Sequence, residues 1–332
     1  MKKVSLAIVG ATGMVGRTLL KVLEERYFPV EDIRFFASEE DLELKVFFLG
    51  KTYGVEMLTE ESFDRKIDIA LFSASEEVSE KYAPIARGKG VVVIDNSNAW
   101  RMDDSVPLIV PEVNPDWIER HIGIISNPNC STIQVVVPLK ALHDAYGLKR
   151  VVFTTFQAVS GSGVNGLKEL ENTQNGEMHH LYPHPIADNC IPHVGDFLEN
   201  GYTKEEVSMI EETRKILNLP ELKITATCVR VPIKHGHSIS VNVELERDFT
   251  VEGVKRLMYE YPGIILVDDP EIDAYPTVLK ANGMDGICVG RIRRDPSLTN
   301  GLNLWIVADN VRKGAATNAI QIAELLIKKD VL

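Results

Sequence analysis

Blocks of hydrophobic residues separated by polar stretches run along the first third of the chain and predict strands that alternate with helices. The near-continuous apolar run Val4–Val9 predicts a strand buried on both faces, as a parallel sheet requires. The leucine and valine residues that follow have helical spacing. Further strands are predicted at residues 33–37, 67–72, 91–95 and 122–126, with another helix at 78–87. This order predicts an α/β domain with a doubly wound parallel sheet.

After residue 132 the predicted strands no longer alternate strictly with helices. They lie at residues 151–159, 224–231, 238–245, 287–292 and 302–308. This pattern predicts an α+β domain with a more antiparallel sheet. The last segment, 314–329, has one apolar helical face and is expected to pack back on the first domain. We therefore predict one domain from residues 1–131 and 311–332, and a second from residues 132–310.

Composition narrows the classes of protein to which the chain can belong. A length of 332 residues exceeds what one hydrophobic core usually serves, and 45% apolar with 25% charged residues is typical of a soluble globular protein. The net charge of −12, from 36 basic and 48 acidic residues, argues against nucleic acid as a partner. The first apolar run is too short for a signal peptide, and no apolar stretch could span a bilayer, so a cytoplasmic location is expected. The four cysteines have no zinc-site spacing and are expected to remain thiols.

A glycine-rich turn follows the first predicted strand and opens the first predicted helix. Its spacing, Gly10-x-x-Gly13-x-x-Gly16, is a variant of the dinucleotide fingerprint. In that motif the first glycine allows a tight turn, the second lets a pyrophosphate approach the backbone, and the third allows close helix packing. The context favours a Rossmann-type dinucleotide-binding domain, although a glycine-rich turn without a ligand is the alternative.

The residues after the second predicted strand bear on the type of dinucleotide. Glu39 and Glu40 follow Ser38 about where a ribose contact is expected. An acidic side chain there would bind the 2′-hydroxyl of NAD and repel the 2′-phosphate of NADP. The residues by themselves favour NAD, and the alternative is that both glutamates are solvated loop charges.

One cysteine stands at a turn between an apolar strand and a predicted helix, in the sequence Asn127-Pro128-Asn129-Cys130-Ser131. Free N–H groups and the positive end of the helix dipole at such a position favour thiolate over thiol and can stabilise an oxyanion. We therefore treat Cys130, with the adjacent Asn129, as a candidate catalytic group. A buried, inert cysteine is the alternative.

Three further segments resemble site sequences, at residues 95–101, 156–163 and 228–238. Together with the glycine loop, the cysteine turn and the segment 308–316, they make the chain resemble the aspartate-semialdehyde dehydrogenase family over nearly its whole length. The resemblance implies NADP-dependent reductive dephosphorylation of β-aspartyl phosphate by a cytoplasmic homodimer, or a tetramer, in lysine, threonine and methionine biosynthesis. The first domain would then bind the dinucleotide, and the second would be catalytic and dimerising.

The resemblance also implies a role for individual residues. Cys130 would be the nucleophile, His237 the acid/base catalyst, and Gln157 the residue that orients the acyl group. Substrate contacts are implied for Arg230 with the α-carboxylate, Glu212 with the amino group, and Arg101 and Lys215 with phosphate. Cofactor contacts are implied for Gly10, Thr12, Gly13, Met14, Val15, Gly16, Ser38, Ser160, Gly161 and Asn310.

Elementary chemistry is consistent with these roles. Reduction of an acyl phosphate needs a nucleophile that leaves a thioester, and a histidine with a pKa near working pH could activate the thiol. The residues alone do not separate His237 from His235. Each cation and Glu212 could instead be solvated or ion-paired.

Some features depart from the family or leave other readings open. Many members have a Ser-Arg-Ser-like turn where this chain has Ser38, Glu39 and Glu40, so NAD remains a possible cofactor. His179, His180 and His184 lie in one segment, but adjacent histidines point differently, so no metal is expected and the loop is expected to be structural. Competing functions are another acyl-phosphate reductase, such as N-acetyl-glutamyl-phosphate reductase, and a catalytically idle scaffold.

Overall fold

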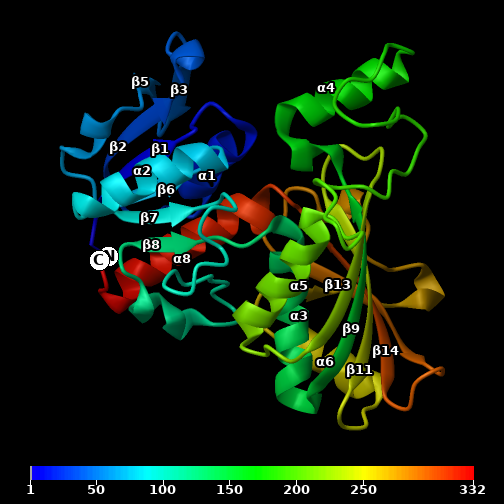
Figure 1. The fold of residues 1–332 in the computed structure, drawn as a ribbon. Coiled ribbons are helices and arrows are strands. Elements are labelled where there is room, and N and C mark those ends of the chain that lie inside the picture. Colours follow the sequence, from blue (N-terminus) through cyan, green and yellow to red (C-terminus); the bar gives the residue numbers. More distant parts are fainter. Residues whose placement is uncertain (1) are drawn as a thin grey trace. The chain divides into compact units, whose positions relative to one another are not determined.

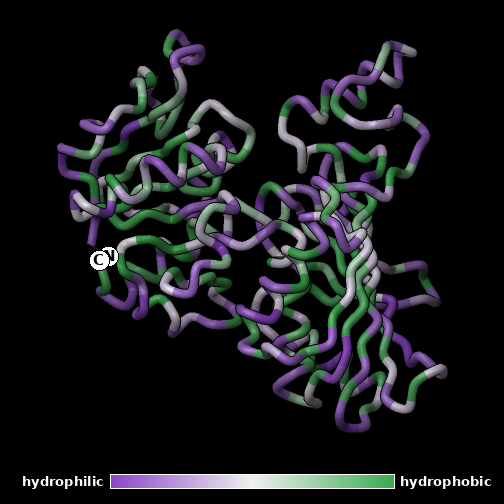
Figure 2. Tube along the Cα trace, viewed as in Figure 1, coloured by the Kyte–Doolittle hydropathy of each residue, from purple (hydrophilic) through white to green (hydrophobic). Residues whose placement is uncertain are grey.

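The computed structural model describes residues 2–332, which form two compact units (Figure 1). The first unit comprises Met1–Asn129 and Ala315–Leu332, and the second comprises Cys130–Gly314. Hydrophobic residues are concentrated along the strands of each unit, whereas the outer loops are mostly hydrophilic (Figure 2).

The first unit contains a parallel six-stranded sheet. The strand order is β5 (Glu56–Met57), β2 (Val30–Ala37), β1 (Val4–Val9), β6 (Ile69–Phe72), β7 (Val92–Asp95) and β8 (Ile124–Ser126). A short hairpin of β3 (Lys45–Phe48) and β4 (Lys51–Gly54) stands outside it. All six residues of β1 are buried, which confirms the strand expected from its unbroken apolar run.

Helices cover both faces of this sheet. On one face, Leu6 and Ile8 of β1 share a core cluster with α1 (Met14–Glu25) and α8 (Thr317–Lys329). On the other, Ala7 and Val9 pack in a cluster with α2 (Glu76–Gly88). A π-helical turn, Arg312–Ala316, precedes α8, so the final α-helix begins later than the sequence pattern indicates. The first unit has the doubly wound arrangement that the sequence predicts.

The second unit is built on a mixed six-stranded sheet. The strand order is β10 (Lys223–Arg230), β9 (Leu148–Gln157), β11 (His237–Leu245), β14 (Gly301–Ala308), β13 (Ile287–Asp295) and β12 (Ile264–Leu266). The two edge pairs are parallel and the inner pairs antiparallel. Figure 1 shows α3 (Cys130–Tyr146), α5 (Lys204–Leu217) and α6 (Val251–Glu260) on one side of this sheet. The remaining helices are α4 (Gly163–Gln174) and α7 (Val278–Ala281). The predicted fold class is confirmed.

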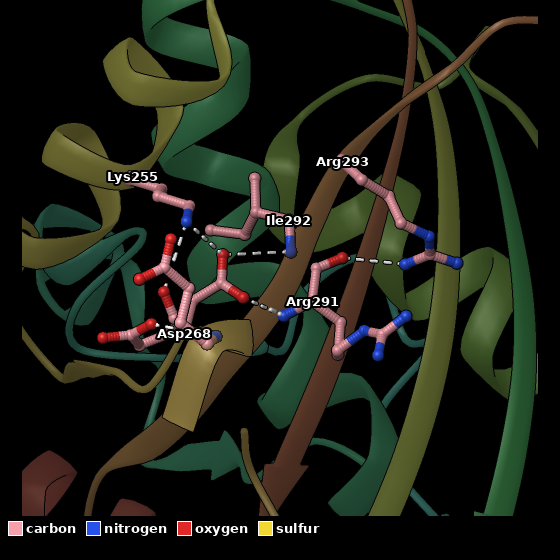
Figure 3. Close-up of polar contacts among 7 residues, drawn as sticks. Lys255, Asp268, Arg291, Ile292 and Arg293 are labelled. Atoms are coloured by element: carbon pink, nitrogen blue, oxygen red, sulfur yellow. Dashed lines mark hydrogen bonds and ion pairs between the residues drawn. The ribbon is translucent and has the colours of Figure 1, made fainter. Parts of the chain in front are cut away.

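A bulge in β13 explains why this strand runs past the predicted end at residue 292. Pairing with β14 shifts between Gly290 and Arg293, and Arg291 has a φ of 53°. The carboxylate of Asp268 accepts hydrogen bonds from the N–H of Arg291 at 2.8 Å and of Ile292 at 3.3 Å, while Lys255 lies 3.1 Å from the same carboxylate (Figure 3). Asp268 thus accepts hydrogen bonds from the N–H groups that the bulge leaves unpaired between β13 and β14.

The sheet face opposite α3, α5 and α6 has half-buried side chains of mixed polarity. Along β9, for example, fully buried residues alternate with half-buried ones such as Thr154 and Phe156. A cavity of about 540 Å³ opens on this face, lined by residues that include Trp305, Tyr275 and Arg293. We call this surface the open sheet face.

Candidate active site

The glycine loop of the first unit has the geometry of a dinucleotide-binding turn. A Cβ at Gly10, where φ is 81°, would lie 2.2 Å from the carbonyl oxygen of Ser73, and a Cβ at Gly16 would lie 2.2 Å from that of Gly10. Gly13, by contrast, would have only one neighbour, at 3.5 Å. The fold itself requires glycine at positions 10 and 16. The fold does not require glycine at position 13, because a Cβ there would have space. This open space suits a ligand that approaches the backbone.

A cavity of about 400 Å³ adjoins this turn within the first unit. It lies at the carboxyl ends of the neighbouring strands β1 and β6, where the strand order reverses and doubly wound sheets bind ligands. Thr12 and Ser38 line it, while Met14 and Val15 form the first turn of α1, whose N–H groups face the loop side. Apolar side chains, including Leu58 and Tyr82, line another part and could hold a flat ring.

Acidic residues line the same cavity, but not the pair named from the sequence. Glu39 lines it and Glu40 does not, whereas Asp41 does. The Thr12 hydroxyl donates a hydrogen bond of 2.5 Å to the Asp41 carboxylate. The sequence analysis did not name Asp41. Its position in the same acidic segment, two residues after Glu39, could have indicated it. Two acidic residues, Glu39 and Asp41, therefore line the cavity.

Arg101 is buried in the first unit and is held by backbone and amide oxygens. Its guanidinium donates to the carbonyl oxygens of Asn127, at 3.1 Å, and Asn96, at 2.8 Å, and to the side chain of Asn98 at 2.7 Å. These bonds fix the plane of the guanidinium. A guanidinium held in this way loses little entropy when it binds an oxyanion.

In the second unit, Cys130 and His237 lie side by side. Cys130 is the first residue of α3 and His237 the first residue of β11, and their Sγ and Nε2 atoms are 3.3 Å apart. A Cβ at Gly314 would lie 3.0 Å from Cβ of Cys130, so glycine there leaves room for the thiol. The half-buried Cys130 therefore combines a helix N-terminus with an imidazole neighbour.

The environment of His237 determines its tautomer and its charge. The backbone N–H of Ala158 donates to Nδ1 at 3.1 Å, so the neutral ring carries its proton on Nε2, which faces Cys130. Complete burial, and secondly the charge of Arg230, lower the pKa of His237 to about 3. The expectation of a histidine pKa near working pH is thus wrong. His237 is a neutral donor toward sulfur, and it stabilises a thiolate better than a thiol.

Gln157 lies next to this pair at the end of β9. Its side-chain amide donates to the Ser131 hydroxyl at 3.1 Å and to the Glu205 carboxylate at 2.9 Å. Ser131 follows Cys130 directly, so these bonds place the amide beside the thiol. Glu205 was not named from the sequence, since nothing in the linear pattern distinguishes it from other glutamates.

Charged candidates for substrate contacts lie on β10 and α5 of the same unit. Arg230 ends β10 with only 5% of its surface exposed, and its Nη1 donates to the carbonyl oxygen of Ala158 at 2.6 Å. Glu212 and Lys215 lie on α5, one nearly fully buried and the other half-buried. Glu212 is therefore not a solvated surface charge.

The remaining candidates lie in the loops that flank His237. Ser160 and Gly161 belong to the 3-10 turn Val159–Ser162. Asn310 accepts a hydrogen bond from the N–H of Gly236 at 2.9 Å, and its amide donates to the Ser160 hydroxyl at 3.0 Å. Asn310 thus ties the loop before His237 to the turn after β9.

The histidine segment 179–184 is held by backbone bonds. The Glu169 carboxylate accepts from the N–H of His180 and of Leu181, each at 2.7 Å. Within residues 2–332, no group of three or more His, Cys, Asp or Glu side chains is placed to hold a metal ion. The four cysteines are free thiols, and burial raises the pKa of Cys228 and of Cys288.

Comparison with known proteins identifies the family. Residues 5–121 match the family model "Semialdehyde dehydrogenase, NAD binding domain", and residues 139–313 match "Semialdehyde dehydrogenase, dimerisation domain". Aspartate-semialdehyde dehydrogenase of Aquifex aeolicus is 50% identical, with 98% of this chain and 99% of the relative covered. The chain belongs to the aspartate-semialdehyde dehydrogenase family.

Solved structures agree with this assignment. Aspartate semialdehyde dehydrogenase II of Vibrio cholerae, complexed with ASA, has a TM-score of 0.95 and 46% identity, with 99% of each chain covered. The Candida albicans enzyme, solved with NADP, has a TM-score of 0.80 and 25% identity over the whole of both chains. All of these relatives are named aspartate-semialdehyde dehydrogenase. The comparisons therefore do not favour the N-acetyl-glutamyl-phosphate reductase or the scaffold alternative.

As a member of this family of oxidoreductases, the chain carries an NAD(P)-binding domain and a dimerisation domain. Its helices, searched over residues 2–332, include none with the length and apolar character needed to cross a membrane.

Proposed function

We propose that this chain catalyses the NAD(P)-dependent reductive dephosphorylation of β-aspartyl phosphate to aspartate β-semialdehyde. The observation that carries the proposal is the 3.3 Å approach of Cys130 Sγ and His237 Nε2 in a member of this family. The reaction belongs to the biosynthesis of lysine, threonine and methionine.

Cys130 forms the covalent intermediate. Its thiolate attacks the acyl carbon, an S–C bond forms, and the C–O bond to phosphate breaks, so inorganic phosphate leaves and a thioester remains. The Nε2–H of His237 donates to sulfur in the resting state. During collapse of the reduced intermediate it is placed to stabilise the leaving thiolate again. The Gln157 amide, which donates to Ser131 and Glu205 and so lies beside the thiol, orients the acyl group.

The substrate's charged groups meet complementary side chains. Arg230 binds the α-carboxylate, for which a planar fork of donors is suited, and the buried Glu212 binds the amino group. Arg101 and Lys215 carry the charge that phosphate requires. The assignment of Arg230 is supported by its buried Nε, which has no hydrogen-bond partner among the described residues and could donate to a carboxylate oxygen.

A nicotinamide dinucleotide, when bound, supplies the hydride that reduces the thioester. Within the first unit, the residues that would hold it are the loop from Gly10 to Gly16 with Ser38. The resemblance also implies contacts from Ser160, Gly161 and Asn310. The space at Gly13 and the cavity beside it fit a pyrophosphate and an adenosine. The resemblance implies NADP, and the Candida albicans structure contains it.

An assay in the reverse direction tests the proposed function. Aspartate semialdehyde should reduce NADP or NAD only when inorganic phosphate or arsenate is present, with absorbance at 340 nm as the readout. Folded protein that gives no turnover with either cofactor at saturating substrate would support the scaffold alternative. Phosphate-independent reduction would contradict the acyl-phosphate chemistry.

The acidic cavity leads to a prediction about cofactor choice. Replacing Glu39 with Gln and Asp41 with Asn should raise kcat/KM for NADP relative to NAD by about thirtyfold, since each of the two carboxylates near a 2′-phosphate costs on the order of 1 kcal/mol. Steady-state kinetics with both cofactors measures the ratio. Glu40→Gln is the matched control, because Glu40 does not line the cavity. An unchanged ratio in the double variant would show that neither carboxylate faces the ribose.

We further propose a homodimer in the cytoplasm. The match to a dimerisation domain supports association, and the open sheet face, with its half-buried Phe156 and Trp305, is the surface we assign to it. Four free thiols, one of them the nucleophile, suit a reducing compartment. Sedimentation equilibrium should give the mass of two chains, and a mass of four would favour the tetramer.

A further inference from the structure

The guanidinium of Arg230 is enclosed on several sides yet retains a donor for a ligand. Its Nη1 donates to Ala158, and a Cβ at Gly161 would lie 2.7 Å from the same nitrogen. Its Nε is buried and has no hydrogen-bond partner among the described residues. A buried donor without a partner costs free energy that an incoming carboxylate oxygen would recover.

One aromatic ring faces this guanidinium. The Tyr182 ring centroid lies 5.9 Å from Cζ of Arg230, within the range of a cation–π interaction. The Tyr182 hydroxyl donates to Oγ of Ser162 at 3.1 Å, and the ring packs against a small cluster that includes Val159 and Leu170. Ser162 belongs to the same turn as Gly161. The ring is therefore anchored to the turn that also contacts Arg230.

The backbone that carries Tyr182 is fastened by one carboxylate. Oε1 of Glu169, on α4, accepts hydrogen bonds from the N–H groups of His180, Leu181 and Tyr182, at 2.7, 2.7 and 3.4 Å. Only 4% of the Glu169 surface is exposed. Burial alone would raise the pKa of Glu169, but these amides outweigh it and the pKa is lowered. The ionised carboxylate thus holds three successive residues against α4.

We infer that Tyr182 is a positioning residue for the substrate's α-carboxylate: its ring holds Arg230 in place, and Glu169 holds Tyr182. The inference rests on the proposed function, in which Arg230 binds that carboxylate. Orientation of the guanidinium matters because its planar fork of donors binds a carboxylate tightly only when the two groups are aligned. This assigns a role to the histidine segment, whose backbone carries the ring.

Kinetics with two aldehydes tests the inference. Tyr182→Leu should raise KM for aspartate semialdehyde about three- to tenfold, the size expected for a partly buried cation–π contact, and leave KM for phosphate unchanged. Tyr182→Phe retains the ring but loses the hydrogen bond to Ser162, so its KM for aspartate semialdehyde should rise less than that of Tyr182→Leu and should match that of Ser162→Ala. With 3-aminopropanal, which lacks the α-carboxylate, Tyr182→Leu and wild type should have equal kcat/KM.

Two milder variants keep the test valid if Tyr182→Leu folds poorly. Ser162→Ala removes the ring's anchor, and Glu169→Gln weakens the hold on the segment. Each should raise KM for aspartate semialdehyde, and the effect of Glu169→Gln should largely vanish in a Tyr182→Leu background, since both act through one contact. Tyr259→Leu, which alters an exposed ring on α6, is the control.

The outcomes separate this inference from the proposed function. Losses of equal size with both aldehydes, or a fall in kcat with an unchanged KM, would show that Tyr182 has only a structural role and would overturn the inference. An inactive wild type would instead contradict the proposed function. An active wild type, together with a rise in KM for aspartate semialdehyde but not for phosphate in Tyr182→Leu, would support both the proposed function and the inference.

Discussion

Replacing Cys130 with alanine should lower the phosphate-dependent rate by more than about a hundredfold, because loss of a nucleophile costs several kcal/mol of transition-state stabilisation. The structure gives the reason in detail. Sγ lies at the N-terminus of α3 and 3.3 Å from Nε2–H of His237, so both the helix and the imidazole stabilise the thiolate. No other described cysteine has these two neighbours.

Two measurements check this prediction. Steady-state turnover of the Cys130→Ala protein gives the rate, and mass spectrometry after iodoacetamide treatment reports which thiol reacts. Cys228 and Cys288 are buried with raised pKa values and should react slowly, so a Cys190→Ser background isolates Cys130. Cys190→Ser should itself remain active. Retention of more than about a hundredth of the rate in Cys130→Ala would rule out covalent catalysis through this residue.

The second large effect is expected at His237. His237→Ala should reduce kcat by about 10² to 10³-fold, the loss usual when a positioned hydrogen-bond donor to a developing negative charge is removed, and slow the alkylation of Cys130 at pH 7. The slower alkylation follows because the thiolate loses its Nε2–H donor, which raises the fraction of neutral thiol. His235→Ala is the matched control, two residues away in the same loop. Equal alkylation rates in wild type and His237→Ala would contradict thiolate stabilisation by the imidazole.

Burial of His237 should also make stability depend on pH. The unfolded chain binds a proton at this residue below pH 6.5, whereas the folded protein, with a pKa of about 3, does not. The contribution is therefore fully present above pH 6.5 and is lost progressively as pH falls toward 3. Between pH 7 and pH 5, wild type should lose about 2 kcal/mol more unfolding free energy than His237→Ala.

Denaturant titrations of wild type, His237→Ala and His235→Ala at the two pH values measure this difference. His235→Ala should behave as wild type, since His235 is only half-buried. If His237→Ala has the same pH dependence as wild type, then the imidazole is protonated in the folded protein.

Much of the architecture was predictable because it depends on local pattern. The apolar run Val4–Val9 and the glycine spacing after it indicate a buried strand, a tight turn and a helix, and these elements form the parallel sheet of the first unit. The bulge at Gly290 to Arg293 was not predictable, because Asp268, which stabilises it, lies more than twenty residues earlier.

The candidate site also contains residues that could be predicted from the sequence and residues that could not. Family motifs named Cys130, Gln157, Arg230 and His237 as candidates, but the residues around them carry no comparable signal. Glu205, which binds the Gln157 amide, and Asp41, which lines the dinucleotide cavity, resemble any other acidic residue in the sequence. Their roles depend on which side chains the fold brings near.

The sequence by itself determined the two fold classes, the cysteine at the start of a helix, and the family to which the chain is similar, since each depends on residue order and local spacing. Only the tertiary structure decided that Cys130 meets an imidazole 107 residues away, that this imidazole is neutral with its proton on Nε2, and that Tyr182 faces Arg230. Burial and hydrogen-bond direction set protonation and side-chain orientation, and both properties arise only when distant segments pack together.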